Sequence, residues 1–154
     1  MNLFRSMLLM CAGAAALASA SPASAACSPV TIFFDWNSAR VEDDSRAAIE
    51  RLAVSLAWKG PDLDHILLTA HTDSSGSTAA NRAMALRRAE AVRDLLLSFD
   101  VPARLIVIKP VGEDRLRVPT PDNVRERYNR RVELLMQSSA ESQAQRLAEG
   151  RPLC

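Results

Sequence analysis

The chain has 154 residues, of which 48% are hydrophobic and 24% charged, a composition typical of one globular domain and not of a disordered segment. It contains 19 Lys and Arg against 18 Asp and Glu; Arg5 is the one charged residue among the first 26, so residues 27–154 carry 18 charges of each sign. Because nonspecific nucleic-acid binding needs a large positive excess on one face, this balance argues against a nucleic-acid partner.

Residues 1–26 have the pattern of an export signal. Arg5 precedes an apolar stretch at residues 7–20, and small residues follow it. The stretch falls short of the roughly 20 residues that a membrane-spanning helix needs, so we expect residues 1–26 to be removed, leaving no transmembrane segment. Ala23-Ser24-Ala25 suits cleavage by a signal peptidase, whereas Ser24-Ala25-Ala26-Cys27 weakly resembles a lipoprotein signal.

Two cysteines, Cys27 and Cys154, stand at the two ends of the expected mature chain. In an oxidising compartment this pair favours one disulfide. By the chain-entropy model, closing nearly the whole domain into a loop would stabilise it by about 4 to 5 kcal/mol. Lipidation of Cys27 is the alternative, and it would leave Cys154 as a free thiol.

Hydrophobic spacing predicts four strands, two long helices and a short polar tail helix. In chain order, we expect a strand at 30–35, a helix from Asp43 or Asp44 to the Gly60-Pro61 break, a strand at 65–70, a helix at 78–99, strands at 105–108 and 131–136, and a polar helix within 138–154. This order is typical of an α/β (α+β) two-layer sandwich, with amphipathic helices on one face of a mixed four-stranded sheet. Residues 110–128 are long for a structureless connection, so they are either partly helical or part of a functional rim.

The second helix places a charge on its apolar face. At about 100° per residue, one stripe contains Asn81, Met84, Ala85, Arg88, Val92, Leu95 and Phe99. A guanidinium that faces a core must find an anion or reach water, and the nearest plausible carboxylate is Asp73, in the turn before the same helix. Arg88 and Asp73 either close a structural salt bridge or stay apart to clamp a ligand of complementary charges, and the stripe does not separate these alternatives.

Other site chemistries find little support. The two histidines, His65 and His71, stand about 20 Å apart along a predicted strand, too far to share a metal ion. No nucleophile or second carboxylate stands at a motif spacing beside His71 and Asp73, so we expect neither an enzyme nor a cofactor. We expect the His71 ring to position the following loop, and Trp36 and Trp58 to pack in the core or at its rim.

Several separated motifs carry a resemblance to a known family. They are Phe33-Phe34-Asp35 with Asn37, residues 71–76, Asn81, residues 87–92, Gly112-Glu113 and residues 129–133. In this order they resemble the OmpA-like peptidoglycan-binding domain of Gram-negative envelope proteins, of the OmpA, Pal and MotB type. The resemblance covers about residues 30–137, and we expect the domain to span 27–154, with residues 138–154 as a helical tail.

The resemblance implies non-covalent, non-catalytic binding of peptidoglycan through the meso-diaminopimelate of its peptide stem, without metal or cofactor. The aspartate matching Asp73 accepts the ligand's ammonium, and the arginine matching Arg88 holds its carboxylate. Four further residues match positions that line the same pocket: Asn37, Thr72, Asn81 and Arg130. The implied location is the periplasm or the periplasmic face of the outer membrane, with a lipid anchor at Cys27 as the less favoured variant.

Two departures from the family pattern concern affinity and not the class of ligand. Ala70 stands where the family usually has Gly, and Met84-Ala85 stands where it usually has Leu-Ser.

The alternative function belongs to a different class. It is an envelope protein-interaction or structural domain with the same fold, which would use the edge formed by residues 110–128 to hold another envelope protein.

Overall fold

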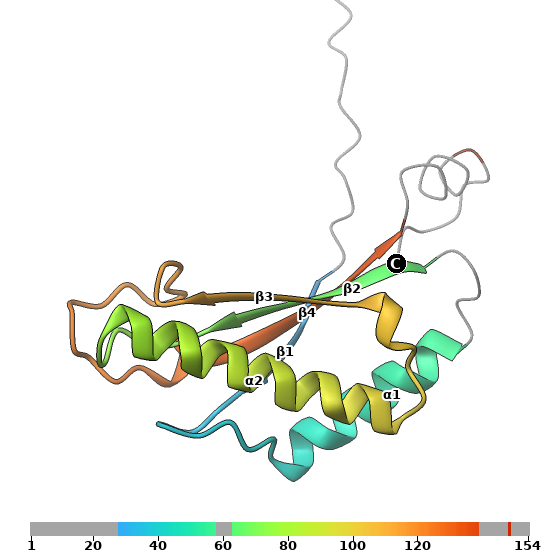
Figure 1. The fold of residues 1–154 in the computed structure, drawn as a ribbon, viewed down its shortest axis with the longest axis horizontal. Helices are drawn as coiled ribbons and strands as arrows, with labels where there is room; N and C mark the ends of the chain where they lie inside the picture. The colour runs from blue at the N-terminus through green and yellow to red at the C-terminus, as the bar shows by residue number, and fades with distance from the viewer. Residues whose placement is uncertain (1–27, 58–62, 139–147, 149–154) are drawn as a thin grey trace, which may run out of the picture.

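The computed structural model describes residues 28–57, 63–138 and 148 (Figure 1). Its main elements are β1 (Val30–Phe33), α1 (Asp43–Ala57), β2 (Leu63–His71), α2 (Thr78–Ser98), β3 (Ile106–Gly112) and β4 (Arg131–Ser138). Short 3-10 turns lie at Ala103–Leu105 and Arg127–Asn129. The predicted order of strands and helices is confirmed. The export signal, the alternatives for Cys27 and Cys154, Trp58 and nearly all of the predicted tail helix lie outside the described residues.

The four strands form one mixed sheet in the order β1-β4-β2-β3. β4 runs antiparallel to both of its neighbours, whereas β2 and β3 run parallel. A parallel pair needs a crossover connection, and α2 supplies it by packing back onto β2, β3 and β4. α1 lies beside α2 and contacts β1, so both helices cover one face of the sheet (Figure 1). The predicted two-layer sandwich is therefore confirmed.

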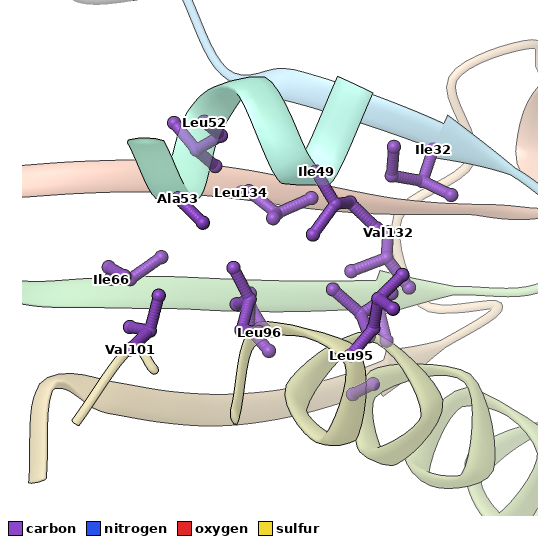
Figure 2. Close-up of a cluster of buried hydrophobic side chains, with 14 of the residues drawn as sticks. Ile32, Ile49, Leu52, Ala53, Ile66, Leu95, Leu96, Val101, Val132 and Leu134 are labelled. Carbon is purple, nitrogen blue, oxygen red and sulfur yellow. The ribbon is translucent and has the colours of Figure 1, made fainter. Parts of the chain in front are cut away.

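The core lies between the helices and alternate residues of the central strands. Ile66 and Leu68 of β2 and Leu134 of β4 are almost fully buried on this face. Ile49 of α1 and Leu96 of α2 belong to the same hydrophobic cluster, much of which Figure 2 shows. Burial of each such side chain is worth roughly 1.5 to 3 kcal/mol. The same cluster includes Ala70 near the end of β2 and Ala85 in the first half of α2, so it holds these two segments together where the polar residues gather.

Two strands differ in length from the prediction. β1 ends at Phe33 instead of residue 35, because the next two carbonyls, of Phe34 and Asp35, accept hydrogen bonds from arginine side chains. β3 continues to Gly112 instead of ending at residue 108. The strand can include Pro110 because β3 is an edge strand, where a missing backbone N–H is tolerated.

The segment between β3 and β4 is irregular; one set of contacts fastens it to the loop after β2, and another joins two of its own residues. The buried Ser74 hydroxyl, in the loop after β2, donates to the Pro121 carbonyl at 2.7 Å and accepts from the Val124 amide at 3.3 Å. The Asn129 side chain bonds both backbone groups of Val118 at 2.8 Å. The segment is thus held against the loop between β2 and α2, with one 3-10 turn as its helical part.

No helix in the described ranges is both long enough and apolar enough to cross a membrane.

Ser74→Ala removes the side-chain hydrogen bonds that fasten this segment, while the backbone bond from the Asn123 amide to the Ser74 carbonyl remains. We expect a loss of about 1 to 2 kcal/mol in the free energy of unfolding, and faster hydrogen exchange at the Val124 amide, because that amide loses its acceptor. Ser98→Ala is the matched control, since the Ser98 hydroxyl bonds the Leu95 carbonyl within its own helical turn. Unchanged exchange at Val124 in Ser74→Ala would contradict the fastening.

Candidate functional site

A cavity of about 420 Å³ opens where the β1–α1 loop, the β2–α2 loop, the first half of α2 and the β3–β4 segment meet. Its volume falls within the range of roughly 300 to 1,000 Å³ typical of small-molecule sites. The six residues that the sequence singled out all line it: Asn37, Thr72, Asp73, Asn81, Arg88 and Arg130. The fold therefore brings together residues from four separate segments of the chain.

Arg88 lies at the bottom of this arrangement with only 1% of its surface exposed. Its Nε donates to the Ser38 carbonyl at 2.9 Å, its Nη1 to the His71 carbonyl at 3.1 Å and its Nη2 to the Asp35 carbonyl at 3.0 Å. The guanidinium also lies over the Phe34 ring, 5.3 Å from its centroid. Of the five N–H donors of an arginine, these contacts use three, and two remain for a ligand.

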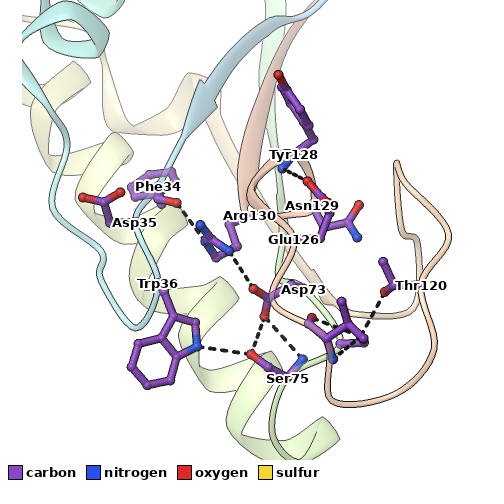
Figure 3. Close-up of polar contacts among 12 residues, drawn as sticks. Phe34, Asp35, Trp36, Asp73, Ser75, Thr120, Glu126, Tyr128, Asn129 and Arg130 are labelled. Carbon is purple, nitrogen blue, oxygen red and sulfur yellow. Dashed lines mark hydrogen bonds and ion pairs between the residues drawn. The ribbon is translucent and has the colours of Figure 1, made fainter.

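Asp73 is buried at the end of β2, and it pairs with Arg130 instead of Arg88 (Figure 3). Its Oδ2 accepts from Arg130 Nη1 at 2.8 Å, while its Oδ1 accepts from the Ser75 hydroxyl at 2.6 Å and the Ser75 amide at 3.3 Å. Arg130 is itself held by the Phe34 carbonyl, to which its Nε donates at 3.1 Å. An ionised carboxylate has about four acceptor positions, so one remains. The closed salt bridge between Asp73 and Arg88 is not found.

Arg88 keeps its positive charge in this position. Burial and the positive charge of Arg130 together lower the pKa of Arg88 to about 10, and Asp73 acts in the opposite direction. A pKa of about 10 leaves the guanidinium protonated at neutral pH. The carbonyls around it orient their dipoles toward this charge without neutralising it, so Arg88 can still attract an anion.

Asn81 is oriented by an acidic neighbour. Its Nδ2 donates to Glu113 Oε2 at 2.9 Å, and the hydroxyl of Thr78 donates to the other oxygen of Glu113 at 2.7 Å. The Asn81 side-chain carbonyl has no hydrogen-bond donor in the described part of the chain. This carbonyl can therefore accept from a ligand.

Thr72 and Asn37 complete the predicted set. The Thr72 amide donates to the Gly112 carbonyl at 2.9 Å, which fixes the backbone, while its buried hydroxyl finds no partner among the described residues. Asn37 has φ +52°, a left-handed conformation that Asn adopts more readily than most residues, so it shapes the turn after β1.

Two residues at the rim of the cavity were not predicted as site residues. Trp36 is 47% exposed, and its Nε1 donates to the Ser75 hydroxyl at 3.2 Å. The guanidinium of Arg125 lies 3.6 Å from the centroid of a Trp36 ring. Packing at a rim was one of the two expectations for Trp36, but its contact with Arg125 joins segments far apart in sequence. No local pattern indicates such a pair.

His71 contacts Arg88 through its backbone, and no hydrogen bond of its ring to a described residue supports the expected role of the ring in positioning the loop. Its carbonyl accepts from Arg88, whereas its buried ring has both nitrogens without a hydrogen-bond partner among the described residues. Burial, and then the charge of Arg131, lower the pKa of His71 to about 4, although Glu133 acts in the opposite direction. The ring is therefore neutral at pH 7.

Comparison with known sequences gives a consistent result. A sequence model of the OmpA family matches residues 33–130. Outer membrane protein A of Escherichia fergusonii is 32% identical over 97 residues, which are 62% of this chain and 40% of that protein. An outer membrane protein of Gluconacetobacter diazotrophicus is 31% identical over 111 residues, 68% of this chain and 29% of that protein. The chain thus spans less than half the length of these relatives.

Solved structures share the fold. The peptidoglycan-associated lipoprotein from Burkholderia pseudomallei is 30% identical with a TM-score of 0.64, over 70% of this chain and 89% of that one. The C-terminal domain of Helicobacter pylori MotB is 21% identical with a TM-score of 0.61, over 77% of this chain and 92% of that one, a likeness of fold. The resemblance read from the motifs is confirmed.

Arg88→Met removes the guanidinium that holds the β1–α1 loop to the end of β2. It leaves the carbonyls of Asp35, Ser38 and His71 without their donor, so we expect a loss of about 3 kcal/mol or more in the free energy of unfolding, measured in urea. Arg87→Met at the exposed neighbouring position is the control, with an expected change within about 0.5 kcal/mol. Equal stability of the two variants would refute this role of Arg88.

His71 makes the fold sensitive to acid. The pKa of a histidine is about 6.5 in the unfolded chain, and that of folded His71 is about 4. Between these values the unfolded state binds one more proton than the folded state, so the free energy of unfolding decreases as the pH is lowered. The full loss is about 3 kcal/mol. We expect His71→Leu to lose less stability than the wild type between pH 7 and pH 4, as measured by urea unfolding. The same loss in both proteins would exclude His71 as the cause.

Proposed function

The chain belongs to the OmpA family, and we propose that it binds peptidoglycan non-covalently, through the meso-diaminopimelate of the peptide stem. One observation carries this proposal. Within a single cavity, the carboxylate of Asp73 and the guanidinium of Arg88 are not bonded to each other, and each keeps hydrogen-bonding capacity unused.

The unused groups match an amino-acid zwitterion. Asp73 has one acceptor position left, which suits an ammonium, and Arg88 has two N–H donors left, which suit a carboxylate. The diaminopimelate of a peptide stem carries an ammonium and a carboxylate on one carbon at its free end. Both charges of the ligand would then find a partner, so neither would be buried without compensation.

Three further groups support the orientation of such a ligand. The side-chain carbonyl of Asn81 can accept from the ligand ammonium, and the buried Thr72 hydroxyl can bond a ligand that enters the cavity. Arg130 holds Asp73 in place and is in this proposal a positioning residue as well as part of the wall. Asn37 contributes through the turn that closes one side.

The proposed role is that of a binding module without catalytic activity. Among the described residues that line the cavity, Asp73 is the one carboxylate, whereas hydrolysis of a glycosidic bond ordinarily uses two. The alternative of holding another envelope protein through residues 110–128 has less support, because that segment is fastened to Ser74 and supplies Asn123 and Arg125 to the cavity.

The similarity to outer membrane proteins and to a peptidoglycan-associated lipoprotein supports a place in the cell envelope. We assign residues 1–26 to export and residues 27–154 to the wall-binding domain, in the periplasm or at the periplasmic face of the outer membrane. The mass of the processed protein tests this assignment, because it separates a disulfide between Cys27 and Cys154 from a lipid on Cys27.

Asp73→Asn tests the site directly. The amide keeps the size of the side chain but loses the charge that binds an ammonium, so we expect at least a roughly tenfold loss of affinity for a diaminopimelate-containing stem peptide, and loss of retention on purified sacculi. Asp114→Asn is the control, since Asp114 is exposed and pairs with Arg82 outside the cavity. Full retention of folded Asp73→Asn on sacculi would end the proposal.

A further inference from the structure

The cavity carries more positive charge than a zwitterion can neutralise. Four arginines line it, against the single carboxylate of Asp73: Arg87, Arg88, Arg125 and Arg130. Neither Arg87 nor Arg125 forms an ion pair with another residue of the described ranges. A bound zwitterion adds no net charge, so the excess persists after the groups of Asp73 and Arg88 are satisfied.

The excess charge acts inside the cavity and not only at its surface. Burial is the main cause of the lowered pKa of Arg88, the positive charges of Arg130 and Arg87 lower it as well, and Asp73 acts in the opposite direction. Like charges held this close favour the binding of a further anion, because that anion relieves their repulsion.

Arg125 is the arginine best placed to hold that anion. Its guanidinium stacks on Trp36 at 3.6 Å, and Trp36 is fixed by its hydrogen bond to Ser75, whose hydroxyl also donates to Asp73. A chain of contacts therefore links Arg125 at the rim to Asp73 inside the cavity, and Figure 3 shows the part of it from Trp36 to Asp73. A cation held over an aromatic ring is pre-organised, which lowers the entropy that binding costs.

Stacking leaves the donors of Arg125 available. The N–H groups of a guanidinium lie in its plane and point outward from its edges, whereas the contact with Trp36 uses its face. None of these N–H groups bonds a described residue of the chain. Such an edge matches a carboxylate in a bidentate geometry.

We propose that Arg125, positioned by Trp36, forms a second carboxylate subsite at the rim of the cavity. It binds a carboxylate of the peptide stem other than the one held by Arg88. This inference rests on the proposed function and names a further determinant of its specificity. Two stem groups have this chemistry: the free α-carboxylate of a γ-linked glutamate and the carboxylate that ends the chain.

Three tripeptides distinguish these sources: L-alanyl-γ-D-glutamyl-meso-diaminopimelate, the same peptide with the glutamate α-carboxylate amidated, and the same peptide with its chain-terminal carboxylate amidated. Titration calorimetry with the wild-type protein is expected to show about fivefold weaker binding of one of the two amides than of the unmodified peptide. Arg125→Gln is expected to bind that amide and the unmodified peptide equally well. Trp36→Leu is expected to reduce the same preference, although Arg125 remains charged.

Arg117→Gln is the matched control, because Arg117 also stacks on an aromatic ring, that of Phe33 at 6.0 Å, but does not line the cavity. It should keep the wild-type preference. Equal binding of all three peptides by the wild type, or an unchanged preference in Arg125→Gln, would overturn the subsite and leave the proposed function standing. If the wild type bound none of the three peptides, the proposed function itself would fail.

Discussion

The buried guanidinium of Arg88 is the contact on which the rest of the structure depends. Three backbone carbonyls converge on it, two from the loop after β1 and one from the end of β2. The Asp35 carbonyl bonds Arg88 and the Phe34 carbonyl bonds Arg130, so the first strand ends early and its loop is held against α2. Arg88 also lines the cavity, so one side chain both organises the loops and forms part of the cavity wall.

The distribution of partners keeps opposite charges available. Carbonyl dipoles stabilise Arg88 without cancelling its charge. Asp73, in contrast, forms an ion pair with Arg130 and accepts a hydrogen bond from the Ser75 hydroxyl. If Asp73 had paired with Arg88, the pair would have used the acceptor position of Asp73 and the N–H donors of Arg88 that the proposed ligand requires. Arg130 thus has a role that is energetic and geometric at once: it permits a buried carboxylate and fixes its direction.

The sequence predicted the parts of this arrangement that depend on local spacing. Helical periodicity placed Arg88 on the buried face of α2, and alternation with β-branched residues located the strands in their correct order. The pairing of Asp73 with Arg130 spans 57 positions, and no local pattern encodes it. The stack of Arg125 on Trp36 depends likewise on where two loops meet, and the extension of β3 past Pro110 depends on its place at the edge of the sheet.

That edge has a consequence for how copies of the domain behave together. An edge strand invites a neighbouring chain to pair with it, and β3 lies at the edge of the sheet that residues 28–57 and 63–138 form. Pro110 offers no N–H to an incoming backbone, and Lys109 beside it is exposed and charged. Where many copies of the domain are crowded together, these two residues oppose the pairing of β3 with the sheet of a neighbouring copy.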